Sequence, residues 1–299
     1  MKKIIAMLLA LAMILCAFAG CSGSQAEEDT TDYSAMTIDE LKPLLQTVTE
    51  GKLTVATSPD FAPYEFYSLD ADGTPTLAGL DIDLAAYIAD YLGLELEIIP
   101  MDFDGTQMEL GNKNCDLSMA GYSPKPEREL LMDFSDVYYT GTQSFITVKG
   151  NEDLFPTLAD ANKAEYQIGA QIASIQYDLA LENTPDADIV TLTKVTDIIA
   201  ELLAGKLDGA FMETIVAETY AMNYPELVVL HDVPYDQEGT VIGVSKGNGP
   251  LRAAVNLALA AAKEDGSMAS FLVNATDLAT GNVYEGLLED LNGTSEATK

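Results

Sequence analysis

Residues 115–139 read CDLSMAGYSPKPERELLMDFSDVYY. The run CDLSMA (115–120) predicts a buried strand, and Pro126 suits the first position of a helix, so Arg128 falls in the first helical turn. A helix N-terminus favours negative charge, so an arginine there indicates an incoming anion, which a guanidinium binds with paired hydrogen bonds. The alternative is a surface ion pair of Arg128 with Glu127, Glu129 or Asp133.

Strands and helices alternate on both sides of this stretch, which is typical of βαβ units. The expected strands are 53–57, 94–99, 115–120, 166–170, 188–192, 207–212 and 241–245. The expected helices are 81–92, 174–183, 196–205, about 213–222 and 250–266, with Gly93 ending the first. Thr37 and Glu40 have capping-box spacing before a short helix. The predicted fold class is therefore α/β with two lobes, each a mostly parallel sheet flanked by helices, and a ligand cleft between the lobes.

Composition excludes one class of partner. The 299 residues suit a two-lobed chain, and 48% are hydrophobic, which is ordinary for a protein with sizeable cores. Acidic residues number 48 against 15 basic ones, a formal charge of −33. Nucleic-acid binders need basic surfaces that neutralise phosphate, so no nucleic acid is expected as a partner. The same charge disfavours non-covalent docking on anionic lipid.

The first twenty residues have the pattern of an export signal. Lys2 and Lys3 precede an apolar run at 4–18, and small residues follow before Cys21. The run FAGC resembles the bacterial lipobox, although Phe18 departs from the usual leucine. We therefore expect Cys21 to carry acyl chains, palmitate among them, that anchor the protein to a membrane. An ordinary signal peptide or an uncleaved anchor are the alternatives.

Residues 22–36 are small, polar and acidic, as in a flexible tether.

The expected fold has no reactive or paired cysteine. Once the signal and the lipidated cysteine are set aside, Cys115 remains alone, so no internal disulfide is expected. Its apolar neighbours indicate a packed thiol. The lone His231 is likewise expected to be packed or solvated, and no metal-spaced cluster or cofactor motif is evident.

The loops after the strands carry the candidate ligand-binding residues. Phe61 and Phe103 follow neighbouring strands and can flank a small ligand, unless both rings fill the lobe cores. Glu213 follows another strand and can hold an ammonium group, unless it only caps a helix. Ser174 opens a helix whose free amides suit an anion. Together with Arg128, these groups predict a site for a zwitterion.

Six segments resemble one known family, the bacterial family 3 extracellular solute-binding proteins, which deliver amino acids to ABC importers. The resemblance runs from about residue 51 to about 269 and is most specific at 115–139. The other segments are GKLTVATSPDFAPYEF (51–66), GLDIDLAAYIADYLG (79–93), MDFDG (101–105), IGAQIASIQ (168–176) and LDGAFMETIVAETYA (207–221). The resemblance implies a binding protein rather than an enzyme.

The resemblance also implies residue roles. Phe61 and Phe103 would form an aromatic sandwich, and Arg128 would hold the ligand's α-carboxylate with help from the amide of Ser174. Glu213 would hold the α-ammonium. Contacts to the amino and carboxyl groups would come from Ala120, Gly121 and Ser123, and contacts to the ligand side chain from Ser58 and Gln171.

The sequence departs from the family pattern at four positions. Lys125 replaces the usual threonine that caps the helix, which removes a cap worth about 1 kcal/mol. Ala173 replaces a glycine, and Glu213 replaces an aspartate. Ser58 stands where many binders of cationic ligands carry aspartate, which favours a neutral, polar amino acid.

The expected organisation follows. Residues 1–20 are the signal peptide, and 21–50 hold the lipidated cysteine, tether and short helix. Lobe 1 comprises 51–139 plus 240–285, lobe 2 comprises 140–239, and 286–299 form a flexible tail. Hinges near 138–142 and 236–240 would close the lobes on the ligand, and the closed form would dock on an ABC permease. We expect an exported monomer, lipid-anchored at the outer face of the cytoplasmic membrane. The alternatives are an enzyme of this fold, similar to cyclohexadienyl or prephenate dehydratase, and an amino-acid-sensing module.

Overall fold

The computed structural model describes residues 31–69, 72–236 and 239–280. The predicted signal segment 1–20, Cys21 and the tail 286–299 lie outside the described residues. The chain divides into two units, Met1–Ala35 and Met36–Lys299, and both large sheets belong to the second unit. Across the described residues, no helix combines the length and apolar character needed to cross a bilayer.

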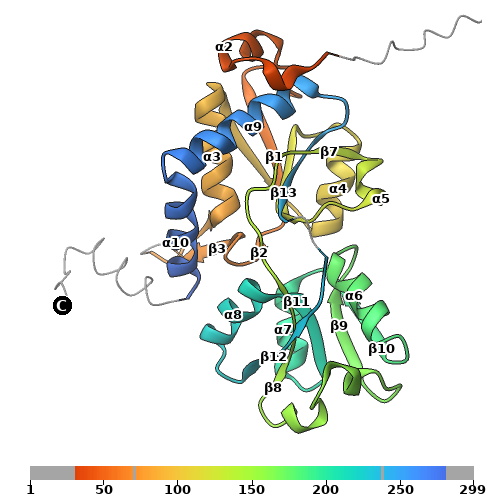
Figure 1. The fold of residues 1–299 in the computed structure, drawn as a ribbon. Coiled ribbons are helices and arrows are strands. Elements are labelled where there is room, and N and C mark those ends of the chain that lie inside the picture. The colour runs from red at the N-terminus through yellow and green to blue at the C-terminus, as the bar shows by residue number, and fades with distance from the viewer. Residues whose placement is uncertain (1–30, 70–71, 237–238, 281–299) are drawn as a thin grey trace, which may run out of the picture. The chain divides into compact units, whose positions relative to one another are not determined.

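Five strands form the first sheet in the order β5-β1-β6-β13-β7 (Figure 1). They are β5 (Glu95–Pro100), β1 (Lys52–Thr57), β6 (Leu117–Tyr122), β13 (Val241–Ser245) and β7 (Met132–Phe134). Helices α3 (Leu80–Leu92) and α9 (Gly249–Glu264) lie on one side of this sheet, and α4 (Phe103–Gly111) lies on the other. We call this sheet and its helices the first lobe. It also holds α2 (Ile38–Leu41), α5 (Pro126–Glu129), α10 (Ser267–Ala279) and a small sheet of β2 (Asp60–Phe61), β3 (Glu65–Leu69) and β4 (Pro75–Ala78).

The second lobe has a sheet of the same size. Its strand order is β10-β9-β11-β8-β12. These strands are β10 (Asp188–Leu192), β9 (Gln167–Gln171), β11 (Gly209–Glu213), β8 (Gln143–Val148) and β12 (Leu227–Val233). Helices α6 (Ile175–Asn183) and α8 (Thr214–Asn223) lie on opposite sides of the sheet in Figure 1, and α7 (Val195–Leu203) connects β10 to β11. The predicted two-lobed α/β fold is confirmed.

Each sheet is mixed, but four of its five strands run in one direction, in keeping with the predicted mostly parallel sheets. In the first sheet β1 runs parallel to β5 and β6, but β13 runs antiparallel to β6 and β7. In the second sheet β9 runs parallel to β10 and β11, but β8 runs antiparallel to β11 and β12. The chain enters β8 and β13 from the other lobe. It arrives at the edge where the parallel strands end, as the pairing of Glu213 with Gln143 shows, and must therefore run in the opposite direction.

The two connections between the lobes pair with each other. Tyr139 and Thr240 form an isolated antiparallel bridge, in which the Thr240 amide donates to the Tyr139 carbonyl oxygen at 2.7 Å. The Tyr138 amide donates to the Thr240 carbonyl oxygen at 2.9 Å. Both residues of the bridge fall inside the segments predicted as hinges.

Local signals set the ends of the elements that carry the site. Gly93 adopts a left-handed conformation with φ +75° and ends α3, as predicted. Thr37 and Glu40 form the predicted capping box of α2. Cys115 is a fully buried free thiol, and burial raises its pKa to about 12, so the prediction of a packed thiol is confirmed. Helix α3 packs Leu84 and Ile88 into the core, while Ile82 is half-buried.

Several elements were not anticipated. Phe103 begins helix α4, although the sequence suggested a loop there. The small sheet, β8, β12 and α10 were also missed. Strand β12 is hard to recognise from its sequence, because most of its residues are only half-buried. A register shift between Val229 and His231 also interrupts its pairing with β8.

Candidate functional site

Arg128 lies where the sequence placed it, in the first turn of α5, with Pro126 beginning the helix. The side chain is 3% exposed. Its Nη1 donates to the Ser123 carbonyl oxygen at 2.7 Å, and its Nη2 donates to the Ala173 carbonyl oxygen of the second lobe at 3.0 Å. Nε donates to Gln107 Oε1 at 3.3 Å.

This buried cation has no anionic partner among the described residues. The surface ion pair left open by the sequence is not formed, and Asp133 pairs with Lys246 at 2.7 Å instead. The guanidinium lies 5.5 Å from the ring centroid of Phe103 and 5.1 Å from that of Tyr122. Desolvation lowers the pKa of Arg128. A buried charge is costly unless it is paired, so the site suits an anion that comes from outside the protein.

Seven of the ten predicted ligand residues line one small cavity with Arg128 among them. The cavity volume is about 10 Å³, roughly the space of one water molecule. An amino acid therefore enters only if the two lobes separate. The lining residues are Phe61, Phe103, Ala120, Gly121, Ser123, Arg128 and Gln171, together with Ile175 and Gln176, which the sequence analysis did not single out.

Gly121 brings the backbone against one of the two aromatic rings. Its φ is +59°, and a Cβ built on it would lie 2.7 Å from Phe61 Cε1. The Phe61 ring stacks on Tyr64, with centroids 5.5 Å apart and an interplanar angle of 18°. A glycine is therefore needed here for both the left-handed backbone and the close approach.

Ser174 does not line this cavity. It caps α6, where its Oγ accepts from the Tyr177 amide at 3.2 Å and donates to the Gln171 carbonyl oxygen at 2.7 Å. The Ser174 amide also donates to the Gln171 carbonyl oxygen, at 3.3 Å. The preceding Ala173 has φ +60°, which explains why a glycine suits this position.

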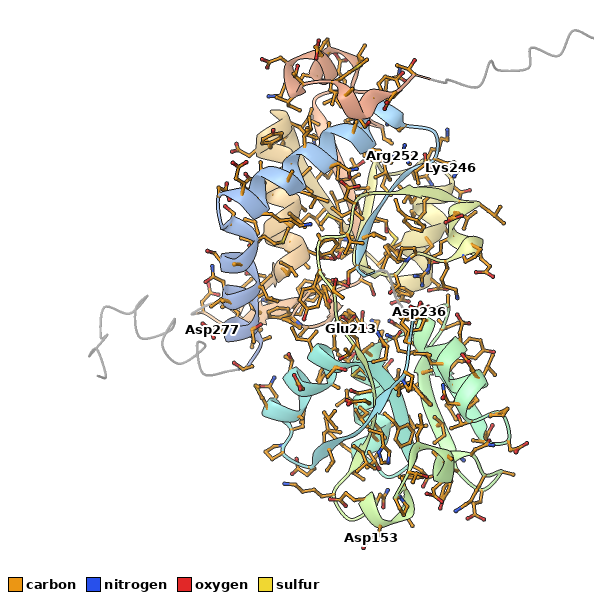
Figure 2. The ribbon with its side chains drawn as sticks, viewed as in Figure 1. Asp153, Glu213, Asp236, Lys246, Arg252 and Asp277 are labelled. Carbon is orange, nitrogen blue, oxygen red and sulfur yellow. The ribbon has the colours of Figure 1, made fainter. Side chains whose placement is uncertain are left out.

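Glu213 ends β11, next to α8 (Figure 2). It is 3% exposed, and its Oε1 accepts a hydrogen bond of 2.6 Å from the Tyr64 hydroxyl of the first lobe. Within the described structure its carboxylate does not cap α8, so the reading as a simple helix cap is wrong. Burial raises the pKa of Glu213 to about 7. A carboxylate held in this state gains from an arriving ammonium group.

Asp60 is a buried carboxylate that the sequence analysis overlooked. Its Oδ1 accepts from Ser58 Oγ at 2.7 Å, and its Oδ2 accepts from the Val195 amide at 2.5 Å and from Gln171 Nε2 at 3.3 Å. Val195 is the first residue of α7, so a first-lobe carboxylate meets the N-terminus of a second-lobe helix. Ser58 and Asp60 line a second cavity of about 550 Å³, whose other polar residues include Asp102, Lys194 and Tyr220.

Glu65 and Asp81 form a buried acid pair that was also overlooked. Asp81 accepts from the Tyr138 hydroxyl at 2.6 Å and from the Gly121 amide at 3.3 Å. Neither carboxyl oxygen of Glu65 receives a hydrogen bond from the described residues. Desolvation and then the nearby Asp81 raise the pKa of Glu65 well above its ordinary value. These effects favour the protonated form of Glu65, and burial also raises the pKa of Asp81, to about 6.

Two ion pairs join the lobes beside the site. Lys125 Nζ pairs with Asp178 Oδ2 on α6, and Lys194 Nζ lies 3.8 Å from Asp102 Oδ1. Lys125 precedes α5 as its cap residue but its side chain gives no cap hydrogen bond, as far as the described residues show. The departure from threonine thus exchanges a helix cap for a contact between lobes.

The described residues contain no cluster of three or more metal-ligating side chains. His231 packs on Phe145, with ring centroids 6.5 Å apart, and its Nε2 lies 2.7 Å from the Phe155 carbonyl oxygen. His231 is half-buried, and both of its partners, Phe145 and Phe155, belong to the hydrophobic core of the second lobe rather than to the Arg128 cavity.

The fold and the cavity together explain the match to a protein family. The family model described as bacterial extracellular solute-binding proteins, family 3, matches residues 53–273. The chain belongs to this family.

Individual members of family 3 agree with this assignment. The arginine-binding extracellular protein ArtP of Bacillus subtilis is 31% identical over 73% of this chain and 83% of its own length. A solved amino-acid ABC transporter substrate-binding protein from Streptococcus pneumoniae, bound to L-arginine, has a TM-score of 0.72 and 33% identity, covering 80% of this chain and 97% of that one. The ancestral amino-acid-binding protein AncCDT-1, described as a precursor of cyclohexadienyl dehydratase, has a TM-score of 0.68 and 29% identity, covering 81% of this chain and 100% of that one. The prediction of a binding protein rather than an enzyme is supported by these relatives.

Proposed function

We propose that this family 3 protein captures an amino acid outside the cytoplasm and delivers it to an ABC importer. The observation that carries the proposal is Arg128, a buried guanidinium without an anionic partner in the described structure, which lines a cavity together with Phe61 and Phe103. An α-carboxylate is the group that would neutralise it.

The remaining groups fit the rest of a zwitterion. Glu213 would bind the ligand's α-ammonium group, and the aliphatic part of the ligand would lie between Phe61 and Phe103. Ala120, Gly121 and Ser123 would contribute hydrogen bonds to the amino and carboxyl groups. Ser58 and Gln171 would face the ligand side chain, and Ser174 would approach the carboxylate once the ligand has displaced the Arg128 bond to Ala173.

Ligand capture would proceed by hinge closure. The cavity around Arg128 is too small for an amino acid, and the paired connections at Tyr139 and Thr240 are the two links on which the lobes would move. Contacts from both lobes to one ligand would favour the closed form. We place lobe 1 at 51–139 plus 240–285 and lobe 2 at 140–239.

Export and anchoring complete the proposal. The signal at 1–20 and the lipobox-like FAGC support cleavage before Cys21, acylation of that cysteine and attachment to the outer face of the cytoplasmic membrane. The protein would act as a monomer, and the closed form would dock on a membrane permease.

The first test is thermal unfolding of the purified protein, refolded to strip bound ligand, against each common amino acid. A ligand at 100 times its dissociation constant adds about 2.7 kcal/mol to the free energy of unfolding, which raises the melting temperature by several degrees. A shift with one or a few amino acids, lost in Arg128→Ala, is the expected result. Absence of a shift with every amino acid, or an unchanged affinity in Arg128→Ala, would reject the proposal.

One rival deserves its own assay, because a relative is described as the precursor of a dehydratase. Glu213, whose pKa burial raises to about 7, would be the general acid in such an enzyme. Turnover of prephenate or arogenate by the purified protein would favour this function over amino-acid capture. A pull-down separates the remaining alternative, an amino-acid sensor, from a transport protein. Recovery of a permease would indicate transport, and recovery of a receptor would indicate sensing.

A further inference from the structure

The orientation of the Gln171 side-chain amide is fixed by its neighbours. Nε2 donates to Asp60 Oδ2 at 3.3 Å and to the Thr193 carbonyl oxygen at 3.1 Å. A carbonyl oxygen and a carboxylate oxygen both only accept hydrogen bonds. The reversed amide would place Oε1 against two acceptors, so the nitrogen must face them.

The same geometry leaves Gln171 Oε1 as the group offered to the cavity. Gln171 lines the Arg128 cavity, and both of its N–H groups are used by Asp60 and Thr193. Among the described residues no donor bonds to Oε1, and this oxygen is not a buried, unsatisfied atom. The ligand side chain therefore meets a hydrogen-bond acceptor from Gln171 rather than a donor.

Hydrogen bonds fix both the side chain and the backbone carbonyl of Asp60 beside Gln171. Ser58 Oγ and the Val195 amide bond its two oxygens, at 2.7 Å and 2.5 Å, and the Tyr220 hydroxyl bonds its backbone carbonyl at 3.0 Å. The Asp60 carboxylate beside Gln171 thus opposes a negatively charged ligand side chain, and the Gln171 carbonyl oxygen opposes a side chain without donors.

We propose that Asp60 is a positioning residue that sets ligand specificity by turning the Gln171 carbonyl oxygen into the cavity, which selects amino acids whose side chains end in N–H donors. This inference rests on the proposed amino-acid capture and deepens it. Amides, guanidinium and ammonium groups fit the class, whereas carboxylate and purely apolar side chains do not. A site built to accept from a donor rejects an analogue that lacks it, because the acceptor is left unpaired.

The test is isothermal calorimetry of the ligand-stripped full chain with the common amino acids and with norleucine. The apolar side chain of norleucine is similar in length to those of glutamine and lysine but carries no donor. We expect the tightest ligand to carry an N–H donor, and to bind at least about tenfold more tightly than norleucine. If the tightest ligand is acidic or aliphatic, the inference fails while the proposed function stands. If no amino acid binds the folded protein, the proposed function fails first.

Variants then ask whether Asp60 acts through Gln171. In Asp60→Asn the Gln171 amide keeps only the Thr193 carbonyl oxygen as a fixed acceptor and turns more easily, so the affinity ratio between the tightest ligand and norleucine should fall severalfold. Gln171→Met removes the acceptor itself and should lower this ratio about tenfold. The double variant should fall no further than Gln171→Met alone, and Asp133→Asn should leave the ratio unchanged, because Asp133 pairs with Lys246 and lines neither the Arg128 cavity nor the cavity that Asp60 lines. Equal weakening of both ligands in Asp60→Asn would show a merely structural role and overturn the proposal. Multiplying effects in the double variant would overturn it as well.

Discussion

The Tyr64 hydroxyl donates a hydrogen bond of 2.6 Å to Glu213 Oε1, which joins residues 149 positions apart and in different lobes. Gly141, in the connection between the lobes, makes room for the carboxylate, since a Cβ there would lie 2.3 Å from Glu213 Oε1. Burial against this phenol and glycine raises the pKa of the Glu213 carboxyl to about 7, so it is partly protonated near neutral pH. This relationship predicts how stability depends on pH.

We expect Glu213→Gln to stabilise the ligand-free protein at high pH only. Burial raises the pKa of Glu213 from 4.5 to about 7, so between these values the folded state holds a proton that the unfolded state has lost. Stability from this group therefore falls as pH rises from about 4.5 to about 7. A neutral glutamine avoids that loss, on the order of 2 kcal/mol at pH 8 and close to zero at pH 4.5.

Urea unfolding of both proteins across this pH range measures the difference. A stability gap that stays constant with pH would contradict the raised pKa. Tyr64→Phe is a useful companion, because removing the phenol takes away the hydrogen bond that favours the Glu213 carboxylate. Its stability loss should therefore be greater at pH 8 than at pH 4.5.

Glu65→Gln should be nearly silent for stability at neutral pH. Neither oxygen of Glu65 accepts a hydrogen bond from the described residues, and its pKa is raised well above the ordinary value, so glutamine imitates the protonated acid. Asp116 is the matched control. It is equally buried, but accepts from the Val48 amide at 2.7 Å, the Thr54 amide at 2.8 Å and Thr54 Oγ1 at 2.6 Å.

Thermal unfolding at pH 7 separates these two acids. We expect a change within about 1 kcal/mol for Glu65→Gln, and a loss of about 2–3 kcal/mol for Asp116→Asn, whose new N–H group would face donors. A large loss in Glu65→Gln would mean that this carboxyl is ionised and makes contacts that the structure does not show.

Gly121→Ala should damage both stability and ligand binding. The new Cβ would lie 2.7 Å from Phe61 Cε1, and φ is +59°, so strain and a clash act together. Gly247→Ala is the control for strain alone, since its φ is +81° and no atom of the described residues lies within 4 Å of the added Cβ. Strain alone costs about 1 kcal/mol.

The two glycine variants are compared by unfolding free energy and by affinity for the ligand found in the thermal screen. Gly121→Ala should lose more than the control in stability and at least about tenfold in affinity, because it displaces the Phe61 ring that we propose flanks the ligand. Gly247→Ala should keep its affinity. Equal affinity losses in the two variants would show that Phe61 does not contact the ligand.

Local sequence signals were enough for the features that depend on a few neighbouring residues. Pro126 placed Arg128 in the first turn of α5, and Gly93 ended α3, because both effects arise from the backbone of adjacent residues. Seven predicted ligand residues meet in one cavity because the ends of parallel strands share an edge. That shared edge follows from topology, which alternating strands and helices reveal.

Contacts between distant segments were beyond the sequence. Asp60 meets Val195 across 135 positions, and no short-range pattern predicts such a pair. Strand β8 was missed for a related reason. Its antiparallel pairing with β11 and β12 depends on how the chain crosses between the lobes rather than on the residues of β8. Glu65 was missed because an acid after a Pro-rich loop is usually exposed, and only packing shows that it is buried.

Lys125→Thr should make the first lobe more stable but weaken ligand binding. Threonine restores the cap of α5, worth about 1 kcal/mol, while the variant loses the ion pair of Lys125 with Asp178 across the lobes. The Asp178 side chain is 51% exposed, so the pair is screened by solvent and contributes about 0.2–1 kcal/mol to closure. We therefore expect a higher melting temperature without ligand and an affinity about two- to fivefold lower.

Asp178→Asn isolates the ion pair, because it breaks the same contact without restoring a cap. It should reproduce the affinity loss without the gain in stability, and the double variant should lose no more affinity than either single variant. Added salt should weaken ligand binding in the unmodified protein more than in Lys125→Thr, because salt screens the pair. If both proteins respond equally to salt, and the two affinity losses multiply in the double variant, then Lys125 and Asp178 do not act together in closing the lobes.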